Sequence, residues 1–317
     1  MTKFHLTLCA LLYLSSAFSQ DKNWEDEKIL VNNESSVSHI ISANQIFEKR
    51  WDVLPQPQFW KKIMCLTPDT CVVNIAQNRH VLETIPSANW IYLSKENKKK
   101  FRDSIRDKYK LKEDELVYVT SGKNHFYKFD DVYPSISKGI ELFDSLCVDP
   151  WYAQSILLIE SPGQLKKSVS GAYGPFQLMP SVARAQGLIV NKTKDERKDF
   201  NRSAFGAASL LKKICIPETK NILEKHQIQY DENEIWFRLL VLHVYHAGAY
   251  NVAAVVDKIQ PKEGTQKLIM NMWQNKAAGF GNCSQNYSQI ALAAHLILHD
   301  IIYENCSDII SPNSKKK

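Results

Sequence analysis

Amphipathic helical patterns follow one another almost without a break from Ile136 to the C-terminal region, and they restrict the fold more than any other feature of the chain. Apolar residues at Ile136, Ile140 and Phe143 recur at helical intervals and therefore share one face. A second helix is expected to begin at Asp149-Pro150, because Asp is a good N-cap and Pro is tolerated in the first turn. Further helices are expected near residues 181–187, 203–215, 233–246, 250–258, 265–275 and 286–303. The sequence therefore predicts a mainly α fold for this part of the chain.

Residues 44–134 have a mixed pattern, which predicts a smaller α/β segment before the helical domain. The charged stretch 95–115 carries apolar residues at helical intervals and is expected to be a solvated helix. Residues 116–120, Leu-Val-Tyr-Val-Thr, predict a short strand, and residues 125–129 are expected to be its partner. The pattern changes near Pro134, where we place the domain boundary.

Three tryptophans belong to this N-terminal segment: Trp51, Trp60 and Trp90. Their rings could stack on sugars, but burial in a core is the favoured interpretation for large aromatic side chains. The sequence gives no role for residues 44–134.

The two ends of the chain are expected to lie outside the fold. Residues 1–19 combine Lys3 with an apolar run and small residues before the cleavage point, which is typical of a secretory signal peptide. The apolar run is too short to span a bilayer, so we expect export to the periplasm or cell envelope. Polar residues 20–43 are predicted to form a flexible leader, and residues 306–317 a disordered basic tail.

The net charge of +6 and the seven cysteines bear on partners and cofactors. A mild positive charge suits acidic polymers in general, nucleic acid included, and does not choose among them. Cys9 leaves with the signal peptide, and the other six cysteines either pair as disulfides after export or stay as buried thiols. No cysteine or histidine cluster has metal-ligand spacing, so we expect neither a metal nor another cofactor.

Glu160 occurs where the helical pattern requires an apolar residue. The helix after Pro150 has Ala153, Ile156 and Leu157 on one face, and Glu160 is the next member of that series. Burial of a carboxyl group disfavours its charged form and raises its pKa, which suits a general acid near neutral pH. The alternative is a helix-end glutamate turned to solvent, and the helix alone does not decide between the two.

Two later segments have compositions that suit a binding site. Residues 170–180, Ser-Gly-Ala-Tyr-Gly-Pro-Phe-Gln-Leu-Met-Pro, form an uncharged stretch whose glycines allow the backbone to approach a ligand closely. Within it, Gln177 offers both a donor and an acceptor. Residues 244–252 place small residues between Tyr245 and Tyr250 at the end of an apolar helix, where a tyrosine hydroxyl can reach a buried acid.

In their order and spacing, these blocks resemble the soluble lytic transglycosylases, a family with a goose-type lysozyme-like fold. The matching residues are Glu160-Ser161, Gly171-Ala172-Tyr173-Gly174, Gln177-Leu178-Met179-Pro180, Asn201 with Gly206, Tyr245-His246-Ala247-Gly248 and Tyr287. The resemblance implies a lysozyme-like helical catalytic domain over residues 135–305, whereas residues 20–134 resemble no family.

The chain departs from the family pattern in four places. His246 replaces the Asn of Tyr-Asn-Ala-Gly, and residues 249–250 replace a pair that usually contains Gly or Pro. Residues 283–284 stand where Glu-Thr commonly precedes the late tyrosine, and residues 175–176 replace Leu-Met. None of these changes removes the acid, although they could alter which sugars are preferred. His246 is expected to be a packed or hydrogen-bonded residue rather than a second catalyst.

The resemblance implies a peptidoglycan lytic transglycosylase in which Glu160 is both acid and base. Such an enzyme cleaves the β-1,4 bond between N-acetylmuramic acid (MurNAc) and N-acetylglucosamine (GlcNAc) and leaves 1,6-anhydro-MurNAc ends. A hydrolase with two carboxylates is disfavoured, because Asp195, Glu196 and Asp199 lie in a charged run that is expected to be a solvated turn. The residues expected to bind the glycan are Ser161, Tyr173, Gln177, Met179, Tyr245, His246 and Tyr287.

The partner implied by the resemblance is the glycan strand of peptidoglycan, with no nucleic acid. The protein is expected to act as a monomer and to associate peripherally with the cell wall or outer membrane. Three alternatives remain: a hydrolytic muramidase on the same fold, a non-catalytic wall-binding protein, and a protein whose main function lies in residues 44–134 as a binding or regulatory module.

Overall fold

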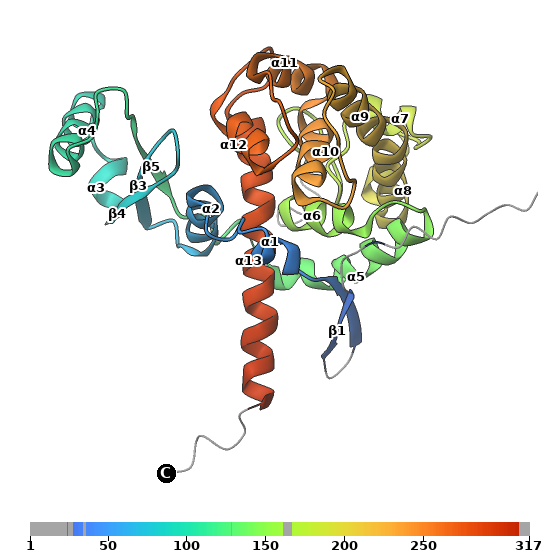
Figure 1. The fold of residues 1–317 in the computed structure, drawn as a ribbon. Coiled ribbons are helices and arrows are strands. Elements are labelled where there is room, and N and C mark those ends of the chain that lie inside the picture. The colour runs from blue at the N-terminus through green and yellow to red at the C-terminus, as the bar shows by residue number, and fades with distance from the viewer. Residues whose placement is uncertain (1–23, 25–27, 34–35, 128, 161–166, 311–317) are drawn as a thin grey trace, which may run out of the picture.

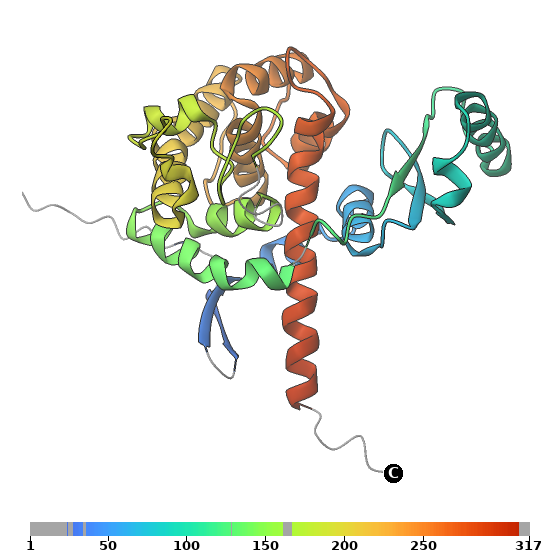
Figure 2. The same ribbon diagram turned by 180° about the vertical axis from the view of Figure 1, so that it is seen from behind.

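A long C-terminal helix, α13 (Asn282–Ile310), stands between the two parts of the molecule (Figures 1 and 2). A helical body lies on one side of α13, and a smaller mixed α/β region projects on the other. The computed structural model describes residue 24 and residues 28–33, 36–127, 129–160 and 167–310. The predicted fold class, mainly α with a smaller α/β segment at the N-terminus, is confirmed.

The helical body is built around two apolar helices, α6 (Pro150–Glu160) and α10 (Ile235–Ala247), which are buried on nearly every side. The expected N-cap joins them: one carboxylate oxygen of Asp149 accepts a hydrogen bond of 2.9 Å from the backbone N–H of Trp151. The other oxygen accepts a bond of 2.8 Å from the buried guanidinium of Arg238. The remaining helices are α5 (Phe129–Ser145), α7 (Pro180–Ala185), α8 (Phe200–Leu210), the π-helix η3 (Leu211–Cys215), α9 (Ile216–Lys225), α11 (Ala249–Ile259) and α12 (Gln266–Gln274).

Every helix expected in this body is present, but two boundaries differ and one further helix was not expected. Helix α5 begins at Phe129, so the predicted boundary near Pro134 falls inside a helix. Helix α13 reaches Ile310, so the tail predicted over residues 306–317 is wrong for residues 306–310, and residues 311–317 lie outside the described part of the chain. Helix α9 was not expected. It follows η3 directly, and its Pro217 lies in the first turn, where proline is tolerated.

The α/β region consists of a small antiparallel sheet with two helices packed near it. Its elements are β3 (Thr70–Ile75), β4 (Val81–Pro86), α3 (Ala88–Ile91), α4 (Lys95–Tyr109) and β5 (Val117–Ser121), with the strand order β4-β3-β5. Buried Ile105 of α4 packs against Val73 and Val117 of the sheet. The expected helix and first strand are confirmed, but residues 125–129 do not form the partner strand. Strand β5 pairs instead with the apolar strand β3, and Phe129 already belongs to α5.

Two short helices, α1 (Asn44–Glu48) and α2 (Pro55–Cys65), lead into this region, and α2 packs against α13. The indole N–H of Trp60 donates to Oε1 of Gln289 at 3.2 Å, and the guanidinium of Arg79 donates to Oδ1 of Asn286 at 3.1 Å. Trp60 is therefore a core residue, as expected, and so is Trp51. Trp90 is not, because it is only half-buried.

The flexible leader predicted over residues 20–43 is wrong for residues 28–33 and 36–41. Strands β1 (Lys28–Asn33) and β2 (Ser36–Ile41) form an antiparallel hairpin with the polar asparagines near its tip. Buried Gln154 of α6 holds β2, since its side chain bonds both the N–H and the C=O of Ile41 at 2.9 Å. The segment is thus ordered by a partner far away in the sequence.

Five of the six remaining cysteines are free thiols. Cys71 and Cys215 are buried, as one alternative expected, whereas Cys65, Cys147 and Cys283 are exposed. Within the described ranges, no helix is both long and apolar enough to cross a bilayer. The expected signal peptide, residues 1–19, lies outside those ranges.

Candidate active site

Glu160 is the last residue of α6, and its carboxyl group is largely removed from water. The nine residues before it, 151–159, are all buried, so α6 delivers Glu160 from the core of the body. Desolvation raises the pKa of Glu160 from 4.5 to about 7. The sequence left open a desolvated acid or a glutamate turned to solvent. The carboxyl group lies largely away from water because the whole helix before it is buried, and not one face alone.

A pocket of about 230 Å³ opens in front of Glu160. Its lining combines small polar and apolar side chains: Ser168, Ser170, Ala172, Gln177, Leu178, Met179, Val182, Leu210, Tyr245 and His246. Glu160 is the single acidic residue among these lining residues. Searched over its described residues, the chain holds no group of three side chains that could bind a metal ion.

Tyr287 of α13 lies beside Glu160 and is buried. Its hydroxyl interacts with the carboxylate and lowers the pKa of Glu160, an effect smaller than the rise caused by burial. The hydroxyl makes no hydrogen bond of standard geometry to a described residue. The His246 ring stacks on Tyr287 with centroids 4.2 Å apart, and burial lowers the pKa of His246 to about 4, so this imidazole is neutral at pH 7.

Tyr245 of α10 connects the loop over the pocket to the helical body. Its hydroxyl donates a hydrogen bond of 2.6 Å to the carbonyl oxygen of Phe176. Burial raises the pKa of Tyr245 well above 10, and the nearby carboxyl of Glu160 adds to that rise. The phenol therefore stays protonated and can donate.

Arg197 holds the loop of residues 167–179 by hydrogen bonds to its backbone. The guanidinium of Arg197 donates to the carbonyl oxygens of Gly171 and Leu178, both at 2.9 Å, and is itself paired with Asp195. Gly174 has φ +83°, and a Cβ at this position would lie 1.9 Å from the carbonyl oxygen of Arg197. Glycine is therefore required here both by backbone conformation and by space.

The solvated turn predicted for the charged run 195–199 is wrong for Glu196 and Arg197, which are buried, whereas Lys198 and Asp199 are exposed. Glu196 is largely buried, and it bonds the backbone N–H of Ile189 at 2.8 Å and the guanidinium of Arg202 at 3.1 Å. The carboxylate of Asp199 caps α8 by accepting from the N–H of Arg202. These acids are used in holding the fold, and they do not line the pocket.

The residues expected to bind a ligand gather around Glu160 with two exceptions. Gln177, with φ +45°, lines the pocket and donates from its side chain to the carbonyl oxygen of Gly174 at 2.9 Å. Met179 lines the pocket and remains exposed. Tyr173 does not line it, and its ring contacts the cations of Arg197 and Lys198. Ser161 lies outside the described residues.

Sequence reasoning missed Tyr127, Ser168, Ser170 and Leu210. Tyr127 comes from the segment before α5, and its hydroxyl has its pKa raised chiefly by burial and further by Glu160. No motif could have indicated it, since it was expected in a strand of a different domain. Ser168 and Ser170 flank the glycine-containing block, and their proximity to it was the one available signal.

No protein-family model matches the chain, and a search of curated proteins gives no match either.

Proposed function

We propose that this protein is a lytic transglycosylase of peptidoglycan, with Glu160 as both general acid and general base. The observation that carries the proposal is a single desolvated carboxyl group, with a pKa of about 7, at a pocket lined by no other acid. A group with this pKa is partly protonated at neutral pH, so it can donate a proton and later take one back.

The reaction needs only one carboxyl group. Glu160 donates its proton to the oxygen of the β-1,4 bond between MurNAc and GlcNAc, and the bond from that oxygen to C1 of MurNAc breaks. The acetamido group of the same sugar stabilises the cationic centre that develops at C1. The Glu160 carboxylate then takes the proton from the 6-hydroxyl of MurNAc, whose oxygen bonds to C1 and closes the 1,6-anhydro ring. No water is consumed.

The residues near Glu160 suit supporting roles in this reaction. The Tyr287 hydroxyl stabilises the carboxylate after the first proton transfer, because its interaction lowers the pKa of Glu160. Gln177, Ser168 and Ser170 offer hydrogen-bonding groups at the rim for the sugar. Neutral His246 supports Tyr287 by stacking and adds no charge to the site.

The test is product analysis by mass spectrometry of purified peptidoglycan treated with wild-type protein, with Glu160→Gln and with Glu141→Gln as a matched control. Glu141 lies on α5, is well exposed and does not line the pocket. Wild type and Glu141→Gln should release fragments with 1,6-anhydro ends, and folded Glu160→Gln should release none.

Other product patterns would contradict the proposal in distinguishable ways. Reducing ends, which carry the elements of one additional water, would make the protein a hydrolytic muramidase. Wild-type protein that binds peptidoglycan but releases nothing would make it a wall-binding protein. Activity retained in Glu160→Gln would remove Glu160 from the mechanism.

A further inference from the structure

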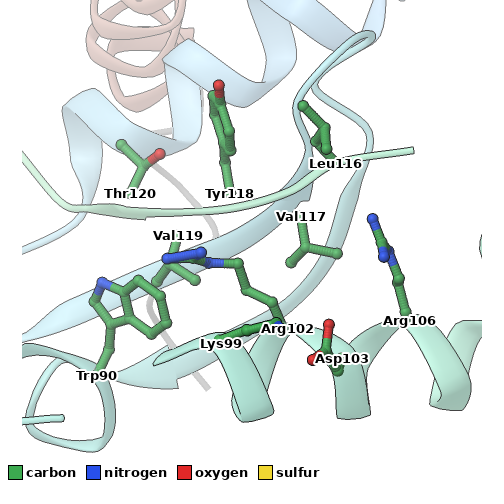
Figure 3. A pocket seen from close by; sticks show the side chains of 10 residues that line it. All are labelled: Trp90, Lys99, Arg102, Asp103, Arg106, Leu116, Val117, Tyr118, Val119 and Thr120. Atoms are coloured by element: carbon green, nitrogen blue, oxygen red, sulfur yellow. The ribbon is translucent and has the colours of Figure 1, made fainter. Parts of the chain in front are cut away.

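The α/β region has its own groove, which lies away from Glu160 and has a volume of about 380 Å³ (Figure 3). It runs between helix α4 and strand β5. Trp90 lines one part of it. The residues from α4 are Lys99, Arg102, Asp103 and Arg106, and those at β5 are Leu116, Val117, Tyr118, Val119 and Thr120. The function proposed above does not use this groove.

The groove follows the edge of β5 rather than one of its faces. Figure 3 shows Val117 and Val119 pointing toward α4, whereas Leu116, Tyr118 and Thr120 point to the opposite side. Side chains from both faces of β5 line the groove, so the groove runs along the backbone at the edge of the strand. The strand order β4-β3-β5 leaves this edge without a neighbouring strand within the described sheet.

The hydrogen-bond pattern identifies which backbone groups face the open edge. The N–H of Gly122 donates to the carbonyl of Thr70 at 2.9 Å, and the N–H of Ala76 donates to the carbonyl of Leu116 at 2.7 Å. In an antiparallel pair these bonds recur at every second residue, so residues 116, 118, 120 and 122 face β3. The N–H and C=O groups of Val117 and Val119 therefore point outward, along the groove. Such an edge is a template for another extended chain.

The helix side of the groove is cationic. Lys99, Arg102 and Arg106 line it together with one acid, Asp103. Lys99 and Arg102 have no carboxylate within ion-pairing distance among the described residues. The Arg102 guanidinium lies 5.2 Å from the Trp90 ring, and Arg106 donates to the carbonyl of Glu113 at 3.1 Å, which holds these two cations beside the strand.

We propose that this groove binds an extended acidic peptide, which adds to β5 as a fourth strand and places carboxylates against Lys99, Arg102 and Arg106. Main-chain hydrogen bonds to Val117 and Val119 would supply the backbone recognition, and alternate side chains would supply the charge complementarity. The partner is thus a protein segment with acidic residues at every second position.

The experiment measures binding of a fluorescent decapeptide of alternating Glu and Thr to the purified protein by fluorescence anisotropy. The matched variants are Lys99→Glu and Lys100→Glu, adjacent lysines of α4 of which only Lys99 lines the groove. Lys99→Glu should weaken binding about tenfold or more, because it brings like charges together, and Lys100→Glu should bind nearly as wild type does. Equal loss in both variants would mean non-specific attraction to a basic helix and would overturn the proposal.

Two N-methylated versions of the peptide test the strand addition itself. In an extended peptide the Glu N–H groups point to one edge and the Thr N–H groups to the other. One version carries methyl groups on all Glu amides and the other on all Thr amides, and only one of them should lose binding. Equal affinities of the two versions would overturn the proposal, as would displacement of the peptide by a chitin hexasaccharide, which would assign the groove to glycan.

Discussion

The buried hydroxyl of Tyr287 lowers the pKa of the Glu160 carboxyl, against the larger rise that burial causes. Tyr287→Phe should therefore raise the pKa of Glu160 further and move the alkaline limit of activity upward, by at most about one pH unit. A well-aligned hydrogen bond to a charged group contributes about 1.5–3 kcal/mol, and this contact falls short of standard geometry. The measurement is the pH profile of kcat/KM on solubilised glycan. Tyr250→Phe, an exposed tyrosine on α11, is the control and should leave the profile unchanged. An unchanged pH profile for Tyr287→Phe would show that this hydroxyl does not affect the pKa of Glu160.

For the wild-type protein, the first proton transfer requires protonated Glu160. With a pKa of about 7, the protonated fraction falls as the pH rises through 7, so kcat/KM should fall about tenfold per pH unit well above that value. The measurement is the release of anhydro ends between pH 5 and pH 9. A constant rate across this range would contradict the assignment of Glu160 as the acid.

Glu160→Gln should stabilise the protein at alkaline pH while abolishing activity. The pKa of Glu160 is higher in the folded state than its usual 4.5, so the stability connected with the protonated carboxyl is complete at low pH and is lost as the pH rises through about 7. Glutamine avoids that loss. We expect the free energy of unfolding at pH 8 to increase by about 1–2 kcal/mol, after allowing for partial exposure of the group, and to change little at pH 5. Urea unfolding at the two pH values measures this, and a variant less stable than wild type at pH 8 would contradict it.

Two glycines with the same backbone conformation give a matched test of the loop over the pocket. Gly174 and Gly187 both have φ +83°, but only at Gly174 would a Cβ collide with backbone, at 1.9 Å from the carbonyl oxygen of Arg197. Gly187→Ala should cost about 1–2 kcal/mol, the usual penalty of the left-handed region, and keep activity. Gly174→Ala should cost more and also lower activity, because it displaces the loop that carries Gln177 and Met179. Thermal unfolding and anhydro-end release measure both effects, and similar losses in the two variants would show that the contact with Arg197 is unimportant.

The Asp149–Arg238 pair should contribute strongly to stability, since both side chains are buried. Asp149→Ala removes the carboxylate partner of a buried cation and the N-cap of α6, and should cost about 3–5 kcal/mol. The control is Asp144→Ala, which breaks the exposed pair with Lys28 and should cost less than about 1 kcal/mol. Comparable losses in the free energy of unfolding would contradict the assigned difference.

Much of the helical body could be predicted because its signals are local. Each of these signals depends on residues within a few helical turns. Examples are the helix face that begins at Ile136, the cap at Asp149 and the apolar run before Glu160. The α-helix of this body that was missed, α9, follows a π-helical turn and contains Pro217, so its sequence resembles a helix end.

The predictions that were wrong concern segments ordered by distant partners. Residues 36–41 look polar and flexible, but Gln154 of α6 bonds the backbone of Ile41. Glu196 lies in a charged run, but Arg202 and the N–H of Ile189 make its burial favourable. Patterns along the chain carry no information about such partners.

Sequence by itself determined the mainly helical class and the position of Glu160 at the end of an apolar helix. Only the tertiary structure decided how acidic that residue is and what else belongs to its site. The pKa of Glu160 depends on desolvation by elements from across the chain. Tyr127 and Tyr287 lie far from Glu160 in the sequence, and only folding brings them close enough to interact electrostatically with its carboxyl group. Electrostatic effects act over distance in space, and sequence spacing does not record that distance.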